Sequence, residues 1–165
     1  MKKIITLCLA LMTAVTFVSA KDYQHSIGMV AGLGIGAQYK TMVMPNFTIL
    51  AEIGYCTNPD GGTGFGYAGV PIANGVFAYQ TNPLAEGDGI KMSIYAGGQM
   101  KLGYVLGDAG VFGFGAAAGI EANMKNAPIA FSFDFRPGWA MIFTGDGVGA
   151  HLFDYSFNLG VRYRF

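Results

Sequence analysis

The last eleven residues constrain the fold most, because their side chains alternate between apolar and polar. In residues 155–165 one parity is aromatic or aliphatic throughout, whereas the other is small or polar and includes Arg162 and Arg164. Successive side chains of a β-strand point to opposite faces of a sheet, so this segment predicts a strand with one apolar face. Residues 129–139 repeat the pattern and place Asp134 and Arg136 on the polar face.

Four further segments alternate in the same way, namely residues 111–124, 90–104, 47–55 and, more weakly, 74–80. Residues 26–40 also alternate and form either one long strand or two short strands that turn at residues 31–34. A single-chain barrel of the outer-membrane type has an even number of strands, which favours two strands here and eight in all. The predicted fold is therefore all-β, an eight-stranded antiparallel up-and-down transmembrane β-barrel.

The N-terminus has the three parts of a secretory signal peptide. Lys2 and Lys3 precede an apolar stretch over residues 4–18, and Ser19-Ala20 supplies the small residues of a cleavage site. The apolar stretch is short for a membrane-spanning helix, which needs about 20 residues. We therefore expect a signal peptide at residues 1–20 and the barrel domain at residues 21–165. Cys8 lies near the start of the apolar stretch rather than at its end, which argues against a lipoprotein.

Composition supports a membrane barrel over a water-soluble domain. All 26 glycines follow residue 20, a density that disfavours helices, and charged residues make up only 12% of the chain against a typical value of about 25%. The part after residue 20 has eight Lys and Arg against ten Asp and Glu, a balance of −2 that gives no basic patch for nucleic acid. A lone thiol remains at Cys56, and we interpret it as buried and unreactive. An apolar, exported, glycine-rich chain without helical spans favours a closed sheet whose backbone groups all pair.

Alternation alone does not tell which face meets solvent, and a lipocalin-like soluble barrel would turn the apolar face inward. Three features favour the opposite orientation. The polar parity carries few charges and would make a poor soluble surface. The apolar parity is aromatic near strand ends, as at Trp139 and Tyr155, which is typical of the two interfacial girdles of a membrane barrel. The alternation also runs to the last residue, Phe165.

On these residues the chain resembles the small outer-membrane β-barrel proteins of the OmpX/OmpW-like size class. The resemblance rests on the export signal, on the aromatic alternation of residues 131–139 and on the terminal run of residues 160–165. It implies a Gram-negative outer-membrane location and a monomer embedded in outer-membrane lipid. It also implies that periplasmic chaperones and the barrel-assembly machinery are partners, with Tyr163 and Phe165 in the terminal assembly signal. The size class hosts several functions, so the resemblance does not identify an activity.

If the apolar face meets lipid, the polar parity lines the lumen and brings a set of charged side chains together. An eight-stranded barrel is just wide enough for side chains to fill, so we expect these charges to pair across the interior as a plug. A narrow anion-selective path is the alternative. In particular, Arg136, Arg162 and Arg164 outnumber the neighbouring Asp134, so a glutamate must reach across the barrel. The predicted lumen charge network comprises Lys40, Glu52, Lys91, Lys101, Glu121, Asp134, Arg136, Arg162 and Arg164.

Catalytic and cofactor motifs find little support. Outer-membrane lipid A deacylases of similar size use a His and a Ser two residues apart, but Ile27 follows His25 at that spacing and Phe153 follows His151. The glycine strings have no helix after them to cradle a phosphate, and the Asp-Gly pairs lack calcium-loop spacing. We predict no enzyme, cofactor or metal site. The functional hypotheses are a non-enzymatic barrel with a structural or surface-interaction role and, as the alternative, a narrow pore for ions or small solutes.

The connections are expected to alternate in length along the chain. Residues 44–46 and 125–128 are short, carry Pro and Asn, and would face the periplasm together with a longer turn at residues 82–89. Residues 57–72, 105–110 and 143–154 would then form the external loops.

Overall fold

The chain forms a ring of eight antiparallel strands in the computed structural model, which describes residues 24–165 apart from 33, 57–69, 106–108 and 146. The strands are β1 (His25–Ala31), β2 (Gly34–Met44), β3 (Phe47–Cys56), β4 (Val70–Gln80), β6 (Ile90–Val105), β7 (Ala109–Met124), β8 (Ile129–Thr144) and β9 (Gly147–Arg164). A two-residue strand, β5 (Ala85–Glu86), pairs with the start of β6 outside the ring. The predicted signal peptide at residues 1–20 lies outside the described residues.

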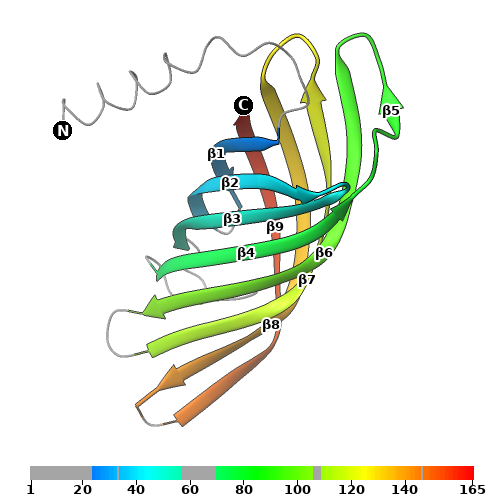
Figure 1. Cartoon of the computed structure of the whole chain (residues 1–165). Helices are drawn as coiled ribbons and strands as arrows, with labels where there is room; N and C mark the ends of the chain where they lie inside the picture. The colour runs from blue at the N-terminus through cyan, green and yellow to red at the C-terminus, as the bar shows by residue number, and fades with distance from the viewer. Residues whose placement is uncertain (1–23, 33, 57–69, 106–108, 146) are drawn as a thin grey trace, which may run out of the picture.

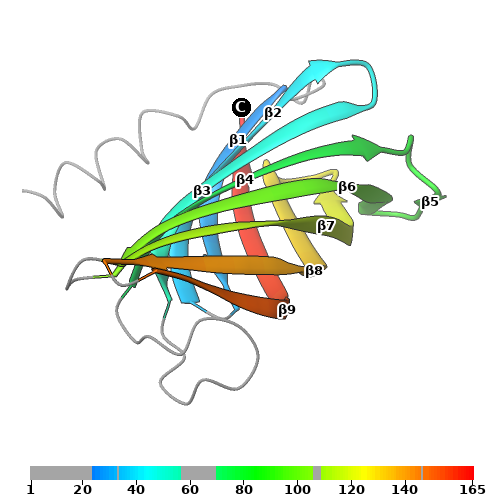
Figure 2. The ribbon, with the colours of Figure 1, turned by 90° about the horizontal axis from the view of Figure 1, so that it is seen from below.

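Each strand pairs with its neighbours in sequence, and two further pairings close the ring. β4 pairs with β6, and the first strand pairs with the last through Ser26–Arg164 to Ala31–Leu159. Figures 1 and 2 show this closed wall from two directions at right angles. When the strand pairing is followed once round the ring, from β1 back to β1, it ends about ten residues away from the starting residue. This stagger tilts the strands of a closed barrel relative to its axis. The predicted eight-stranded up-and-down barrel is confirmed, as is the division of residues 26–40 into two strands.

The two ends of the barrel differ in their connections. At the first, the turn end, lie the chain terminus Phe165, the turn at Pro45-Asn46 and the connection over residues 125–128. Asn46 adopts a left-handed φ of 67°, which asparagine tolerates in tight turns. Its side-chain amide donates a hydrogen bond to the backbone carbonyl of Gln80 at 2.9 Å. The opposite end, the loop end, carries the connections that follow β1, β3, β6 and β8.

The wall is uneven in height at the loop end. Strands β6 to β9 have 16 to 18 residues, whereas β1 to β4 have 7 to 11, so the β8–β9 hairpin projects beyond the β1–β2 hairpin (Figure 1). The predicted external loop over residues 143–154 is wrong. Thr144 pairs with Gly147, and both strands continue through this region. Gly145 and Gly147 indicate a loop in a sequence pattern, but β8 ends at Thr144 and β9 begins at its pairing partner Gly147, which has a positive φ of 147°.

The faces of the strands separate by polarity as predicted. Side chains of the outward parity are largely exposed and apolar, for example Met29 at 64%, Ile53 at 67% and Leu159 at 62% exposure. Most side chains of the inward parity are buried, and they include Gln38, Asp134 and Arg136 at 1% exposure each. The interior of this barrel is thus its polar side. In the described part of the chain no helix is long and apolar enough to cross a membrane.

Candidate functional site

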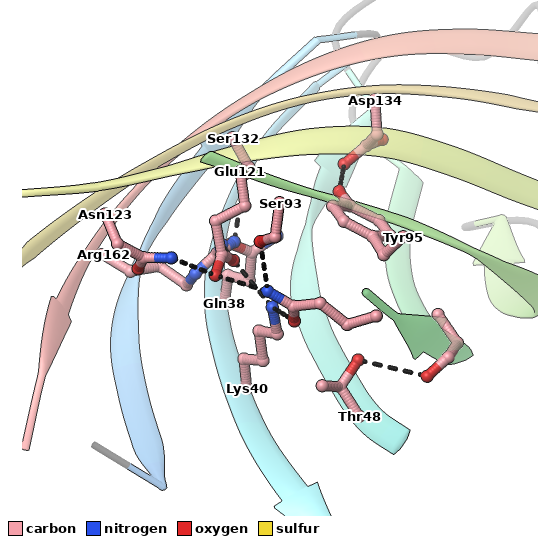
Figure 3. Close-up of polar contacts among 12 residues, drawn as sticks. Gln38, Lys40, Thr48, Ser93, Tyr95, Glu121, Asn123, Ser132, Asp134 and Arg162 are labelled. Atoms are coloured by element: carbon pink, nitrogen blue, oxygen red, sulfur yellow. Dashed lines mark hydrogen bonds and ion pairs between the residues drawn. The ribbon is translucent and has the colours of Figure 1, made fainter. Parts of the chain in front are cut away.

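A buried carboxylate, Glu121 on β7, is the centre of the polar cluster nearest the turn end. Its Oε2 accepts a hydrogen bond from Lys40 Nζ at 2.7 Å and a second one from Arg162 Nη2. Its Oε1 accepts from the side-chain amides of Gln80 and Asn123, both at 3.1 Å. Figure 3 shows Lys40 and Arg162 approaching this carboxylate from different strands. Both oxygens of Glu121 are therefore occupied by donors.

Lys40 on β2 also has several partners. Its ammonium donates to Gln80 Oε1 at 2.5 Å and lies 5.4 Å from the ring centroid of Tyr95, a distance at which a cation is attracted to the face of the ring. Gln80 Nε2 in turn donates to Ser93 Oγ at 2.7 Å. The lysine charge is thus compensated by Glu121 and solvated by amide and aromatic groups in place of water.

A second cluster, nearer the loop end, is built on Arg136 of β8. Its guanidinium contacts Glu52 of β3 through two parallel bonds, Nη1–Oε2 at 2.5 Å and Nη2–Oε1 at 2.8 Å. Its Nε and Nη2 donate to Asp134 at 2.6 and 3.0 Å. This arrangement uses the planar fork of arginine against both carboxylates, a geometry that a lysine would not reproduce.

Uncharged side chains complete the second cluster. Tyr95 donates its hydroxyl to Asp134 Oδ2 at 2.6 Å, and Asn158 donates to Asp134 Oδ1 at 3.0 Å (Figure 3 shows the tyrosine contact). Asn74 donates to Glu52 Oε2 at 2.9 Å. Each carboxylate of this cluster therefore receives bonds from neutral donors as well as from the guanidinium.

Gln38 joins the two clusters into one network. Its Nε2 donates to Glu52 Oε1, and its Oε1 accepts a bond from Arg162 Nη1, which also donates to Ser132 Oγ at 3.0 Å. The network therefore contains three cations, Lys40, Arg136 and Arg162, and three carboxylates, Glu52, Asp134 and Glu121. Buried charges are tolerated when they are paired and hydrogen-bonded, and these charges cancel.

Two of the ion pairs cross the barrel. Arg136 on β8 and Glu52 on β3 lie four strands apart in a ring of eight, and so do Glu121 on β7 and Lys40 on β2. These pairs therefore join opposite walls, and they cross the lumen at two levels.

Inward-facing glycines leave room for these side chains. A Cβ atom added at Gly119 would lie 2.6 Å from Asp134 Cβ and 2.8 Å from Tyr95 Cζ, and one added at Gly160 would lie 2.5 Å from Ser132 Oγ. Such distances are far below van der Waals contact. Glycine at both positions is therefore needed for the network to pack.

Three residues of the predicted charge network lie apart from the bonds described above. The side chain of Lys91 is 46% exposed at the turn end, where its Nζ lies 3.7 Å from Glu86. Arg164 donates to the carbonyls of Met124 and Ala127 at the same end. Lys101 is buried and lines a cavity at the loop end. A hydrogen bond from Lys125 Nζ at 2.7 Å lowers the pKa of the exposed Glu86 carboxyl.

The cavity at the loop end has a volume of about 90 Å³, enough for a few water molecules. Polar residues from five strands line it, and the Glu52–Arg136 pair is among them. The side chains that contribute hydrogen-bonding groups are Glu52, Asn74, Lys101, Arg136, Ser156 and Asn158.

Of the candidate catalytic and assembly residues, His25, Tyr163 and Phe165 lie away from the lumen network. His25 Nδ1 forms hydrogen bonds with Tyr39 Oη at 2.8 Å and Thr41 Oγ1 at 3.0 Å, and its ring stacks on Phe165 at a centroid distance of 6.0 Å. The side chain of His151 lies outside the described residues. Phe165 is 39% exposed beside the β1–β9 seam, and Tyr163 pairs with Ile27 across it. Among the described residues no three His, Cys, Asp or Glu side chains are grouped so that they could hold a metal ion.

The comparisons with known proteins find a likeness among solved structures. No protein-family model matches the chain, and no match is found among curated proteins. A solved structure of a major outer membrane protein from Thermus thermophilus is similar to this chain with 14% sequence identity and a TM-score of 0.49, over 88% of this chain and the whole of that one.

Proposed function

We propose that this protein is a non-enzymatic barrel of the bacterial outer membrane. The main support is the apolar outward surface, which runs round the ring as Ile27, Tyr39, Ile49, Phe77, Ile94, Phe114, Phe133 and Phe157, all of them 37% or more exposed. Soluble monomers rarely expose a contiguous apolar surface that runs round the whole molecule. Lipid would cover it, and in a closed ring every strand has a hydrogen-bonded neighbour on each side.

Aromatic side chains near both ends of the wall support the same placement. Tyr55, Tyr104 and Trp139 lie near the loop end and are 50 to 61% exposed. Tyr79 and Phe165 lie near the turn end with 49% and 39% exposure. Amphipathic rings at the two membrane–water interfaces are typical of transmembrane barrels.

The lumen has the properties of a plug in this proposal. Arg136, Arg162 and Asp134 are each 1% exposed, and two ion pairs cross the interior. An ion that passed through would have to break charge-assisted bonds of 2.5 to 2.7 Å at both levels. The role that we propose is therefore structural or surface-interactive rather than transport. In this proposal the loop end faces the exterior of the cell.

Export and assembly complete the proposal. We propose that residues 1–20 are removed as a signal peptide, that periplasmic chaperones carry the chain, and that the barrel-assembly machinery recognises the terminal segment with Tyr163 and Phe165. N-terminal sequencing of protein from outer-membrane fractions is expected to begin at Lys21. An intact N-terminus, or recovery in the cytoplasm, would contradict export.

Planar-bilayer recording of the folded protein tests the plug. We expect no steady single-channel current from the parent protein. The double variant Glu52→Ala with Arg136→Ala removes the crossing pair nearer the loop end. We expect it to give current steps more often than the parent protein. Steady currents from the parent protein would favour the narrow pore.

A further inference from the structure

The rim of the barrel at the loop end has a large step between β9 and β1. Elsewhere along this rim neighbouring strands end opposite each other, as Cys56 of β3 does with Gly34 of β2 and Val70 of β4. At the step, by contrast, the last residue of β1 is Ala31, and it pairs with Leu159, which lies twelve residues after the start of β9. The stagger of the closed ring is therefore concentrated at this point of the rim, where the β8–β9 hairpin projects beyond β1 (Figure 1).

Beyond this step β9 has a strand on one side only among the described residues. Residues 148–154 pair with β8, whereas the ladder between β9 and β1 ends at Leu159. These seven residues of β9 extend over about 20 Å at 3.3 Å per residue. The unpaired edge of a strand presents a row of N–H and C=O groups that can pair with another strand.

The register shows which backbone groups lie on the open side. In an antiparallel ladder successive residues direct their N–H and C=O groups alternately to the two neighbouring strands. The N–H of Arg164 donates to the carbonyl of Pro128 at 2.8 Å, on the side of β8. The register shift that follows Gly138 then reverses this alternation along β9. Ala150, which pairs with Met141, therefore directs its N–H away from β8 and toward the open side.

The turn end shows how this chain covers a similar step. There β4 ends at Gln80, which pairs with Tyr95, while β6 extends further, to Ile90. The segment that contains β5 runs along this edge of β6, and the N–H of Leu84 donates to the carbonyl of Met92 at 2.8 Å. A short extended segment is thus sufficient to pair with such an edge. At the loop end the described residues supply no corresponding segment for β9.

An apolar pair lies beside the open edge. Phe143 of β8 pairs with Val148 of β9, and their side chains are 42% and 65% exposed. Both residues lie beyond Trp139, which belongs to the aromatic side chains near the loop end. In the proposed membrane placement this pair is outside the hydrocarbon region, so lipid does not cover it. A strand added to β9 would cover Val148 with its own side chains.

A second copy of the chain in the same membrane fits this edge poorly. Strands of a membrane barrel tilt by about 35–45° from the barrel axis. A twofold axis along the membrane normal reverses the direction of the tilt, so the β9 strands of two adjacent copies would cross at about 70–90°. Strands that cross at such an angle cannot form a ladder. A separate extended segment has no such constraint.

We propose that residues 148–154 of β9 bind an extended segment of another polypeptide outside the cell, as an added antiparallel strand. Backbone hydrogen bonds supply the affinity, and an apolar side chain on the outward face of the partner lies beside Val148. The inference rests on the proposed function, because the edge faces the exterior only if the barrel spans the outer membrane with its loop end outward.

A synthetic strand peptide tests the edge. The probe has about seven residues of alternating threonine and valine, within the usual length of a strand, and carries a fluorophore. The parent barrel in phosphatidylcholine vesicles is expected to raise the fluorescence anisotropy of this peptide until binding saturates. Hydrogen exchange measured by mass spectrometry locates the site. We expect the amides of residues 148–154 to gain protection when the peptide binds, and those of residues 125–128 at the turn end to remain unchanged.

Two variants close the edge by different means. Ala150→Pro removes an N–H from the open side and none from the ladder with β8, and it is expected to weaken peptide binding by about tenfold or more. An inserted hairpin of about ten residues between Ala31 and Gly34 lengthens β1 and β2 so that they cover the edge, and it is expected to abolish binding. The same insert between Val105 and Ala109 is the matched control, because it lengthens β6 and β7 and leaves the edge open.

The contrary results are separable. No saturable binding by the parent protein, or equal binding by the parent and by the form with the covered edge, overturns the proposal. Protection of residues 148–154 in the free protein shows that the chain covers its own edge and also overturns it, as does cross-linking between two copies at these residues. Quenching of Trp139 by brominated lipid is measured on the same samples. If it is absent, the barrel does not span the membrane and the proposed function fails, whereas normal quenching without peptide binding overturns the interaction site alone.

Discussion

Replacement of Arg136 by leucine tests the inside-out arrangement of this barrel most directly. The guanidinium makes four contacts of 2.5 to 3.0 Å with Glu52 and Asp134 and is 1% exposed. The substitution leaves two buried carboxylates without a cation. Removing one partner of a buried ion pair costs about 3–5 kcal/mol. With a urea dependence of about 1–3 kcal/mol per molar, the unfolding midpoint is expected to fall by about 2 M.

The measurement is urea unfolding of the protein from lipid vesicles, followed through Trp139 fluorescence and confirmed by electrophoretic mobility. Lys91→Leu is the control, because it also removes one positive charge on the inward parity. The Lys91 side chain is 46% exposed and lies 3.7 Å from Glu86, so its loss is expected to cost less than about 1 kcal/mol.

A rescue separates charge from packing. Adding Glu52→Gln and Asp134→Asn to Arg136→Leu removes the uncompensated charges, and we expect part of the lost stability to return. A lipid-facing arginine would instead cost about 2–4 kcal/mol near the membrane midplane, so its replacement by leucine would stabilise the barrel. A raised midpoint for Arg136→Leu would therefore refute the assignment of faces.

Three further predictions concern the network and its assembly. Glu121→Gln leaves two buried cations near a neutral group and is expected to cost about 3 kcal/mol in the same urea assay; an unchanged midpoint would show that the pairs are solvated. Gly119→Ala drives a Cβ against Asp134 and is expected to cost about 1–3 kcal/mol, whereas Gly98→Ala, whose Cβ would lie 3.8 Å from its nearest neighbour, is expected to cost less than about 1 kcal/mol. Phe165→Ala is expected to reduce the amount of barrel in outer-membrane fractions without altering the unfolding midpoint of refolded protein by more than about 1 kcal/mol; normal membrane levels would argue against its role in assembly.

Alternation in the sequence was sufficient to assign the faces of the strands but not their lengths. Residues such as Glu52 and Glu121 share a parity with small or polar neighbours, and a period of two residues is all that this assignment requires. Strand ends depend instead on pairing with a neighbour. The part of β9 nearest the loop end pairs with β8, for example through Val148 and Phe143, although its glycines are typical of a loop.

The lumen could be predicted as a set of charges but not as a network. The neutral members Gln38, Tyr95 and Asn158 lie on the inward parity of their strands, and that signal would have identified them. The position of each charged side chain along the barrel axis could not be predicted from the sequence, because it depends on the stagger between strands. Lys91 has the inward parity too, but it lies beyond the rim, which only the register reveals.

The two ion pairs that cross the barrel also determine when it can become stable. Arg136 and Glu52 are 84 residues apart in the chain, and Lys40 and Glu121 are 81 residues apart. The charges of the early strands therefore have no oppositely charged partner until β7 and β8 have been made and curved round to face them. Until then each charge keeps its water, so a half-closed sheet holds a hydrated interior and gains nothing from these contacts. Their formation coincides with ring closure, and the barrel is expected to form in one cooperative step with a slow rate set by its long-range contacts.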